Sequence, residues 1–127
     1  MNVNILPQSW TPALHASLRI ATALLFLEHG TAKILGFPAL PASSTSGAMV
    51  IGTGVAELIG GVLILVGFLT RPTAFILSGY MAVAYFMAHA PTGFFPILNH
   101  GEMAIMFCFA FFYLAAAGAG PYAVDKA

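Results

Sequence analysis

The sequence is poor in charged residues. Only four acidic and four basic side chains occur in 127 residues, and they give a formal net charge of zero. A soluble domain usually carries about a quarter charged residues, and a soluble protein of this size must cover a large surface fraction with polar groups. The composition therefore argues strongly against a soluble globular protein.

Other scarcities exclude further classes. Lys and Arg are not in excess, so the chain has no basic patch for a nucleic-acid partner. Cys108 is the single cysteine, which excludes a disulfide scaffold. A hydrophobic content of 60% excludes a disordered chain. What remains is an integral membrane protein whose first partner is the lipid bilayer.

Four apolar stretches approach the length of about 20 residues that a membrane-spanning helix needs. They carry no alternating period of two, so helices are favoured over barrel strands. Short connections make sequential helices antiparallel. We therefore predict one all-α domain over residues 1–127, an integral membrane four-helix bundle running up-down-up-down. The predicted spans are about 13–35, 48–69, 72–89 and 99–117, with a Ser-rich loop at 41–47.

Basic residues are unequally shared between the two ends of this predicted bundle. An even number of spans places both termini on one side of the membrane. Arg71 and Lys126 lie on that side and Arg19 lies near it, whereas Lys33 lies near the opposite side. The positive-inside rule then predicts that both termini are cytoplasmic.

Most polar side chains of the predicted spans gather toward the end with the longer loops. Charged groups inside a membrane are costly and are functional candidates by default. The antiparallel order brings together at this end Glu28, His29, Lys33, Glu57, Tyr85, His89, Asn99, His100 and Glu102. We therefore predict a polar pocket near one membrane surface.

Glu57 is the hardest of these residues to explain structurally. It lies about nine residues, or roughly 14 Å, into its span. Gly54 and Gly61 share its face, and small residues allow another helix to approach closely. We expect Glu57 to point into the bundle, where it needs a proton or a partner. By depth, the expected partners are His29, Tyr85 or Glu102, with Arg19 a poorer match.

The other polar residues have structural alternatives. Lys33 could pair with Glu28 or extend its amine to the interface. Asn99 and Glu102 have the spacing of an N-terminal capping box. Residues that suit the membrane–water interface are Tyr85, His89 and His100. The histidines lack ligand spacing on any one helix, so no metal site is predicted.

Several short motifs follow one another along about residues 14–125, each occurring once. They are Leu18-Arg19, His29-Gly30-x-x-Lys33, Glu57-x-x-Gly60-Gly61, Gly67-x-x-Thr70-Arg71, Ala84 to His89, Asn99-His100-Gly101-Glu102 and Gly118-x-Gly120-Pro121. In these motifs the chain resembles the DoxX family of small bacterial membrane proteins. The resemblance implies a four-helix bundle in the bacterial cytoplasmic membrane. It also implies a link to quinone-coupled redox chemistry, as in thiosulfate–quinone oxidoreductase and quinol oxidase complexes.

The first functional hypothesis is a quinone-linked redox component. Quinol oxidation releases two protons, and carboxyl, imidazole or phenol groups at a membrane edge can accept them. The expected proton-handling residues are Glu57, Glu28, Glu102 and His29. The expected quinone-binding residues are Tyr85, His89, His100, Asn99, Lys33 and Arg19. No covalent cofactor is expected, so electrons come from the substrate or from a redox partner subunit.

Two other hypotheses stay open. The chain could be a non-enzymatic membrane subunit whose polar network fixes the helix register. A carrier of small polar solutes is a third reading, although four spans enclose little room. Gly60 and Gly61, together with the aromatic faces, also allow a homo-oligomer. The sequence alone leaves open whether the protein is an enzyme.

Overall fold

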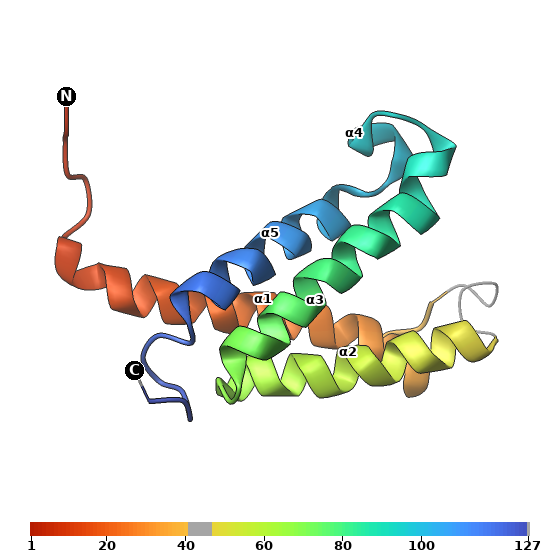
Figure 1. Ribbon diagram of the computed structural model, residues 1–127, viewed down its shortest axis with the longest axis horizontal. Coiled ribbons are helices and arrows are strands. Elements are labelled where there is room, and N and C mark those ends of the chain that lie inside the picture. The colour runs from red at the N-terminus through yellow and green to blue at the C-terminus, as the bar shows by residue number, and fades with distance from the viewer. Residues whose placement is uncertain (41–46, 127) are drawn as a thin grey trace.

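The computed structural model describes residues 1–40 and 47–126, and the regular structure in them is all helical. A π-helical turn (Tyr85–His89) and a 3-10 turn (Ala90–Thr92) extend helix α3 (Thr70–Ala84). The α-helices, in chain order, are α1 (Thr11–Ile34), α2 (Ala48–Val66), α3 (Thr70–Ala84), α4 (Pro96–Asn99) and α5 (Glu102–Ala117) (Figure 1). The predicted all-α class is confirmed for the described residues. Residues 41–46 of the predicted Ser-rich loop lie outside them.

The first three predicted spans correspond closely to helices. Helix α2 ends earlier than predicted because Gly67 adopts a left-handed conformation with φ of 71°, which closes the helix. The fourth prediction, a helix from residue 99, is wrong at its start. His100 has a φ of 62°, so the backbone turns out of the helical conformation there, and α5 begins only at Glu102.

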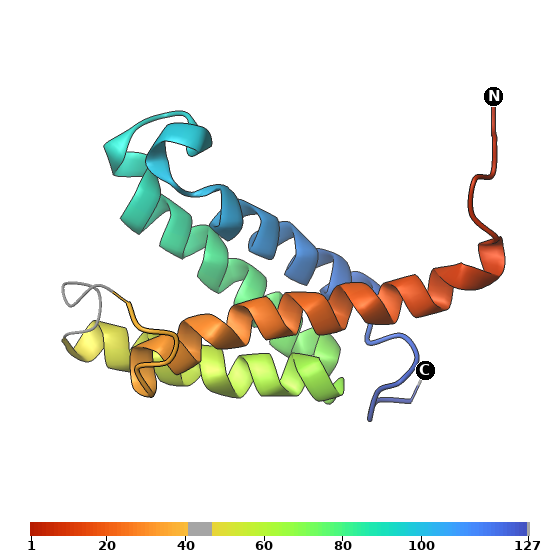
Figure 2. The same ribbon diagram turned by 180° about the vertical axis from the view of Figure 1, so that it is seen from behind.

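The long helices form two hairpins. Helix α1 packs along α2, and α3 packs along α5, while contacts between the two hairpins are fewer. Figures 1 and 2 show that the hairpins lie together near the α2–α3 turn and diverge toward the end that carries α4. The chain termini lie toward the first end, away from α4.

Glycines bring α1 and α2 into close contact. A methyl group built on Gly61 would lie 2.6 Å from the Cγ of Leu27 in α1. A methyl group on Gly54 would lie 3.0 Å from the Cβ of Lys33, also in α1. The prediction that Gly54 and Gly61 admit a neighbouring helix is therefore confirmed, and that helix is α1. Such small residues allow close backbone packing where lipid provides no hydrophobic drive.

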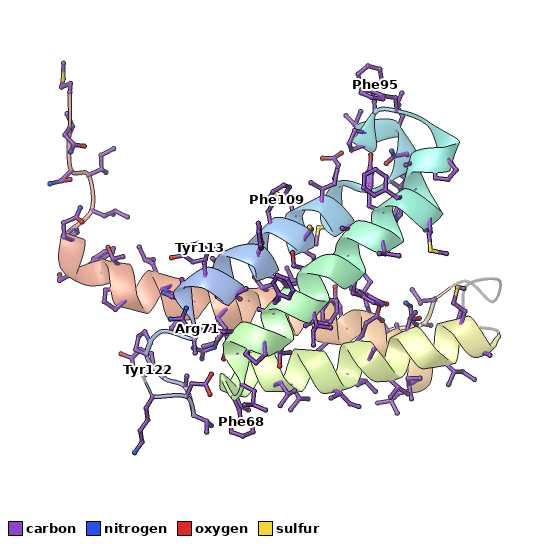
Figure 3. The ribbon with its side chains drawn as sticks, in the orientation of Figure 1. Phe68, Arg71, Phe95, Phe109, Tyr113 and Tyr122 are labelled. Atoms are coloured by element: carbon purple, nitrogen blue, oxygen red, sulfur yellow. The ribbon has the colours of Figure 1, made fainter. Side chains whose placement is uncertain are left out.

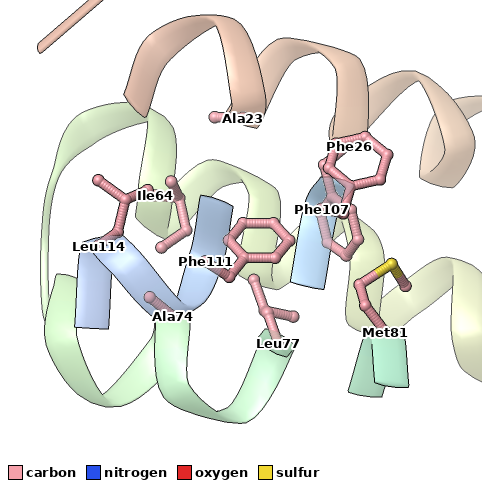
Figure 4. Packing of buried hydrophobic residues seen from close by; sticks show 9 residues of the cluster. All are labelled: Ala23, Phe26, Ile64, Ala74, Leu77, Met81, Phe107, Phe111 and Leu114. Atoms are coloured by element: carbon pink, nitrogen blue, oxygen red, sulfur yellow. The ribbon is translucent and has the colours of Figure 1, made fainter. Parts of the chain in front are cut away.

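Aromatic side chains join the two hairpins in a buried core. Phe26 of α1 lies edge-on against Phe107 and Phe111 of α5, with ring centroids 5.5 and 5.0 Å apart. Such edge-to-face pairs contribute about 0.5–1.5 kcal/mol beyond their buried area. Figure 4 shows the whole cluster, formed by Ala23, Phe26, Ile64, Ala74, Leu77, Met81, Phe107, Phe111 and Leu114.

The outer surface is largely apolar. Large side chains such as Ile59, Phe75 and Phe109 are about two-thirds exposed, at 60%, 64% and 64%. Figure 3 shows Phe109 projecting outward from α5. Two helical stretches of the described chain, Ala48–Val66 and Thr70–Thr92, are long and apolar enough to cross a membrane. An apolar surface of this extent suits lipid better than water.

Candidate functional site

Glu57 lies at the centre of a buried polar cluster between three helices. Its side chain, on α2, is only 3% exposed, so the prediction that it points inward is confirmed. Its Oε2 lies 3.0 Å from Nζ of Lys33 on α1. The hydroxyl of Tyr80 on α3 donates to the same oxygen at 2.8 Å. A cation and a phenol therefore share one carboxylate oxygen.

Lys33 is placed by the close packing of its helix. Gly54 allows the Lys33 backbone to approach α2, so that the amine reaches Glu57. The amine also donates to Oγ1 of Thr53 at 3.2 Å. The Thr53 hydroxyl in turn donates to the Met49 carbonyl at 2.8 Å. Lys33 is thus directed inward and does not extend to the interface.

The second carboxylate oxygen of Glu57 is differently placed. Oε1 is buried and accepts no hydrogen bond from the described residues. A buried carboxylate oxygen without a donor is unfavourable, and such groups in native proteins have a reason. The cluster therefore holds one strong acceptor beside two donor groups, Lys33 and Tyr80.

The prediction that His29, Tyr85 or Glu102 is the partner of Glu57 was wrong, because Lys33 and Tyr80 bind it. His29 is exposed, and its Nδ1 donates to the Leu25 carbonyl at 2.9 Å. Glu28 and Glu102 are exposed and form no side-chain hydrogen bond with the described residues. Depth in the membrane did not identify the true partners, Lys33 and Tyr80, because depth does not show toward which neighbour a helix face points. The roles predicted for these three residues stay predictions.

A second polar cluster joins the end of α3 to the start of α5. Asn99 is buried, and its Nδ2 donates to the Tyr85 hydroxyl at 3.0 Å and to the Gly93 carbonyl at 2.9 Å. Its Oδ1 accepts from the Gly101 amide at 2.8 Å. Nδ1 of His89 donates to the Asn99 carbonyl at 3.0 Å. These bonds satisfy the Asn99 side chain and hold the connection in shape.

The predicted capping box is therefore absent. Asn99 caps the turn that ends at Gly101, and Gly101 itself precedes α5. Glu102 is the first residue of α5, not the third, because the chain leaves the helix at His100. The predicted site residues His100 and Glu102 are both exposed, whereas Tyr85, His89 and Asn99 come together.

Arg19 lies at the opposite end and does not reach Glu57. Its guanidinium is fully buried and donates to the carbonyls of Ala119 at 2.5 Å, Pro121 at 3.1 Å and Tyr122 at 2.8 Å. Arg19 thus fastens the C-terminal tail against α1. Its proposed role in quinone binding would require this tail to move.

The start of α3 is held by the same tail. The Asp125 carboxylate accepts from the amides of Leu69 at 2.9 Å and Thr70 at 2.8 Å, which are free at a helix start. The Thr70 amide, foremost, and the nearby Arg19 charge hold the pKa of Asp125 below its usual 3.8. The oxygens that cap the start of α3 thus come from Asp125.

Tyr80 and Thr53 are site residues that the sequence reasoning missed. A signal for Tyr80 existed. Glu57 lies ten residues before Gly67, and Tyr80 lies ten residues after Thr70, so the turn between α2 and α3 places them at one level. Among the described residues, no three His, Cys, Asp or Glu side chains gather as a metal site would require.

Comparisons with known proteins give consistent results. A family model described as DoxX matches residues 14–90, more than half of the chain. An uncharacterized protein of Haemophilus influenzae is 43% identical over 126 residues, covering 94% of this chain and 93% of that protein. The inner membrane protein YqjF of Escherichia coli is 30% identical over 118 residues, covering 85% and 86%. No solved structure matches the chain.

Proposed function

The chain belongs to the DoxX family of membrane proteins, and from this premise we propose that its Lys33–Glu57–Tyr80 cluster binds the headgroup of a quinone and handles its protons. In this proposal the protein crosses the bacterial cytoplasmic membrane four times. The observation that carries the proposal is the buried Oε1 of Glu57, an acceptor that no described residue uses, beside two donors in an apolar protein.

The helices support a four-span arrangement. Helix α1 has 24 residues and is about 36 Å long, which exceeds the bilayer core of about 30 Å. Its two cations, Arg19 and Lys33, both have hydrogen-bond acceptors within the protein. Helix α5 has only 16 residues, about 24 Å, and would fit with local thinning of the bilayer.

Basic residues support the predicted orientation. Arg19, Arg71 and Lys126 belong to the end that holds the α2–α3 turn and the C-terminal tail. Only Lys33 lies toward the other end, where it is paired with Glu57. The positive-inside rule then favours cytoplasmic termini. The Glu57 cluster would lie in the outer half of the membrane.

The residues of the cluster suit a quinone and its reduced form. A quinone takes up two electrons and two protons to give a quinol. The third N–H of Lys33 can donate to a quinone carbonyl oxygen, and the Tyr80 hydroxyl can do so when it turns away from Oε2 of Glu57. Oε1 of Glu57 can accept a hydrogen bond from a quinol hydroxyl. The Glu57 carboxylate can also take a hydroxyl proton and become a neutral acid, and Lys33 can then stabilise the negative charge left on the quinol oxygen. Electrons would pass to or from a redox partner subunit, or would come from a reduced substrate.

The test is binding of decylubiquinone to the full-length protein in lipid nanodiscs. We expect Glu57→Gln and Tyr80→Phe to weaken binding at least tenfold, because each removes a polar group from the cluster. Glu28→Gln and Glu102→Gln are matched controls, since both carboxylates are exposed. Equal affinity of Glu57→Gln and wild type would contradict the proposal, provided that both melt at similar temperatures.

A second candidate function is a non-enzymatic scaffold. The observation in its favour is that Lys33, Glu57 and Tyr80 join α1, α2 and α3, as a network that fixes helix register would do. In that case decylubiquinone does not bind to the wild type, and Glu57→Gln only lowers the melting temperature. The two measurements, made on one preparation, distinguish the two functions.

A further inference from the structure

A cavity lies at the opposite end of the molecule from the Glu57 cluster. It has a volume of about 640 Å³ and lies between the start of α1, the start of α3 and the C-terminal tail. Its walls include the side chains of His15, Arg71, Asp125 and Lys126 and the backbone of residues 118–121. It plays no part in the proposed quinone chemistry.

Cations outnumber anions in this cavity. Arg71 and Lys126 line it, and the buried Arg19 donates to the Ala119 and Pro121 carbonyls that form its wall. Among the described residues that line the cavity, the one side-chain carboxylate is that of Asp125, and both of its oxygens accept from backbone amides at the start of α3. The net charge facing the cavity is therefore positive, which favours an anionic ligand.

The guanidinium of Arg71 is held in place by hydrogen bonds. It donates to the carbonyls of Ala116 and Ala117 at the end of α5. A methyl group on Gly118 would lie 3.1 Å from the guanidinium, and Gly118 has a φ of 83° that favours glycine. The backbone thus makes room for this cation, which is exposed at the cavity mouth. Arg is well suited to phosphate because of its planar, forked donors.

An apolar groove adjoins the cavity. It has a volume of about 290 Å³, is lined by Leu14, Leu18 and Tyr113, and shares Thr11 and His15 with the cavity. The three lining side chains are 48%, 41% and 49% exposed. Figure 3 shows Arg71 and Tyr113 toward the same end of the molecule. A polar cavity therefore continues into an apolar groove along α1 and α5.

We propose that this cavity binds the phosphate group of an anionic phospholipid and that the groove receives one of its acyl chains. Cationic cavities at the ends of membrane helices suit anionic headgroups. A free phosphate ion would use the cations but leave the groove unfilled, so the groove favours the lipid. The site requires membrane insertion but is independent of any quinone at Glu57.

Native mass spectrometry of the full-length protein from mixed micelles tests the headgroup. We expect wild type to retain phosphatidylglycerol over phosphatidylcholine. The preference should fall about fivefold for Lys126→Gln and further for Arg71→Gln/Lys126→Gln, on the basis of the usual contribution of one cation near a membrane. Lys126 forms no side-chain hydrogen bond with the described residues, so its single variant should fold normally. Equal retention of the two lipids by wild type overturns the proposal.

The groove is tested by a matched pair of substitutions on α1. Leu18→Trp should fill the groove and lower the retention of both lipids, whereas Leu24→Trp changes an exposed residue that does not line it. Added glycerol phosphate at millimolar concentration should not displace phosphatidylglycerol. If it does so, and Leu18→Trp has no effect, the site binds a soluble phosphate and the lipid proposal is wrong.

Discussion

Arg19 and Glu57 are two buried charges that the protein satisfies in opposite ways. Arg19 donates to backbone carbonyls of residues 119–122, which cannot exchange protons. Glu57 is bound by two side chains, Lys33 and Tyr80, and keeps one oxygen without a donor. The first arrangement fixes a tail in place, although Nε of Arg19 is also buried without a partner among the described residues. The second leaves a capacity to accept a hydrogen bond or a proton from a ligand. A buried charge is therefore a functional candidate only when its partners leave such capacity.

The largest effect is expected at Arg19. Arg19→Met would remove the donor of three tail carbonyls and release the tail from α1, so the free energy of unfolding should fall by about 3–4 kcal/mol. Arg71→Met is the matched control, because Arg71 also donates to helix-end carbonyls but is exposed. That loss should stay within about 1 kcal/mol. Equal losses, measured by denaturant unfolding in detergent, would remove the contrast between a buried and an exposed cation.

The ion pair of the Glu57 cluster should show the next effect. Lys33→Met leaves a buried carboxylate without its cation, which should cost about 3 kcal/mol. The double variant Lys33→Met/Glu57→Leu should regain most of this stability, because a packed apolar pair can replace a buried ion pair. Denaturant unfolding of the three proteins gives both values. If the double variant is no more stable than Lys33→Met, then Lys33 and Glu57 stabilise the folded protein by more than cancelling each other's charge.

The contact between α1 and α2 should give a smaller effect. Gly54→Ala would push Lys33 and Ile34 away from α2, so we expect a loss of about 1–3 kcal/mol and weaker quinone binding. Gly52→Ala, two residues earlier on α2, meets no atom within 4 Å and should be neutral or stabilising. Thermal melts and decylubiquinone binding check the pair. A neutral Gly54→Ala would show that Lys33 does not depend on this close approach.

The fold was predictable where hydropathy carries the information. Apolar length located α1, α2 and α3 because a bilayer imposes a minimum span on any helix. It failed at the start of α5, where His100 and Gly101 leave the helix within an otherwise apolar stretch. Hydropathy averages over many residues, so it does not detect a break of two.

The central residue of the site, Glu57, was predictable from the sequence, but the residues that bind it were not. Glu57 was found because a carboxylate in an apolar span is costly. Lys33 was predicted to lie in the polar pocket but not to pair with Glu57, and Tyr80 was overlooked. The sequence gives the depth of a residue in the membrane but not the direction in which its helix face points. The binding of Arg19 to carbonyls could not be predicted either. Every residue has a backbone carbonyl, and the sequence does not show which of them will accept a hydrogen bond from a side chain.

The smallest effect, and the most specific, concerns the pH dependence of the tail. The pKa of Asp125 is lowered in the folded protein by the Thr70 amide, the Leu69 amide and the Arg19 charge. The stability that this carboxylate contributes is therefore complete above its unfolded pKa of about 3.8 and is lost as the pH falls through the lower folded value.

Asp125→Asn should accordingly flatten the decline of the melting temperature below pH 4, while it lowers the melting temperature slightly at pH 7. Glu102→Gln serves as the control, because its exposed carboxylate forms no side-chain hydrogen bond with the described residues. Circular dichroism melts in detergent from pH 2.5 to 7 provide the comparison. Parallel curves for wild type and Asp125→Asn would mean that the carboxylate charge does not help to bind the tail. Arg19 and the backbone hydrogen bonds from Val124 and Asp125 to Val66 and Gly67 would then hold it.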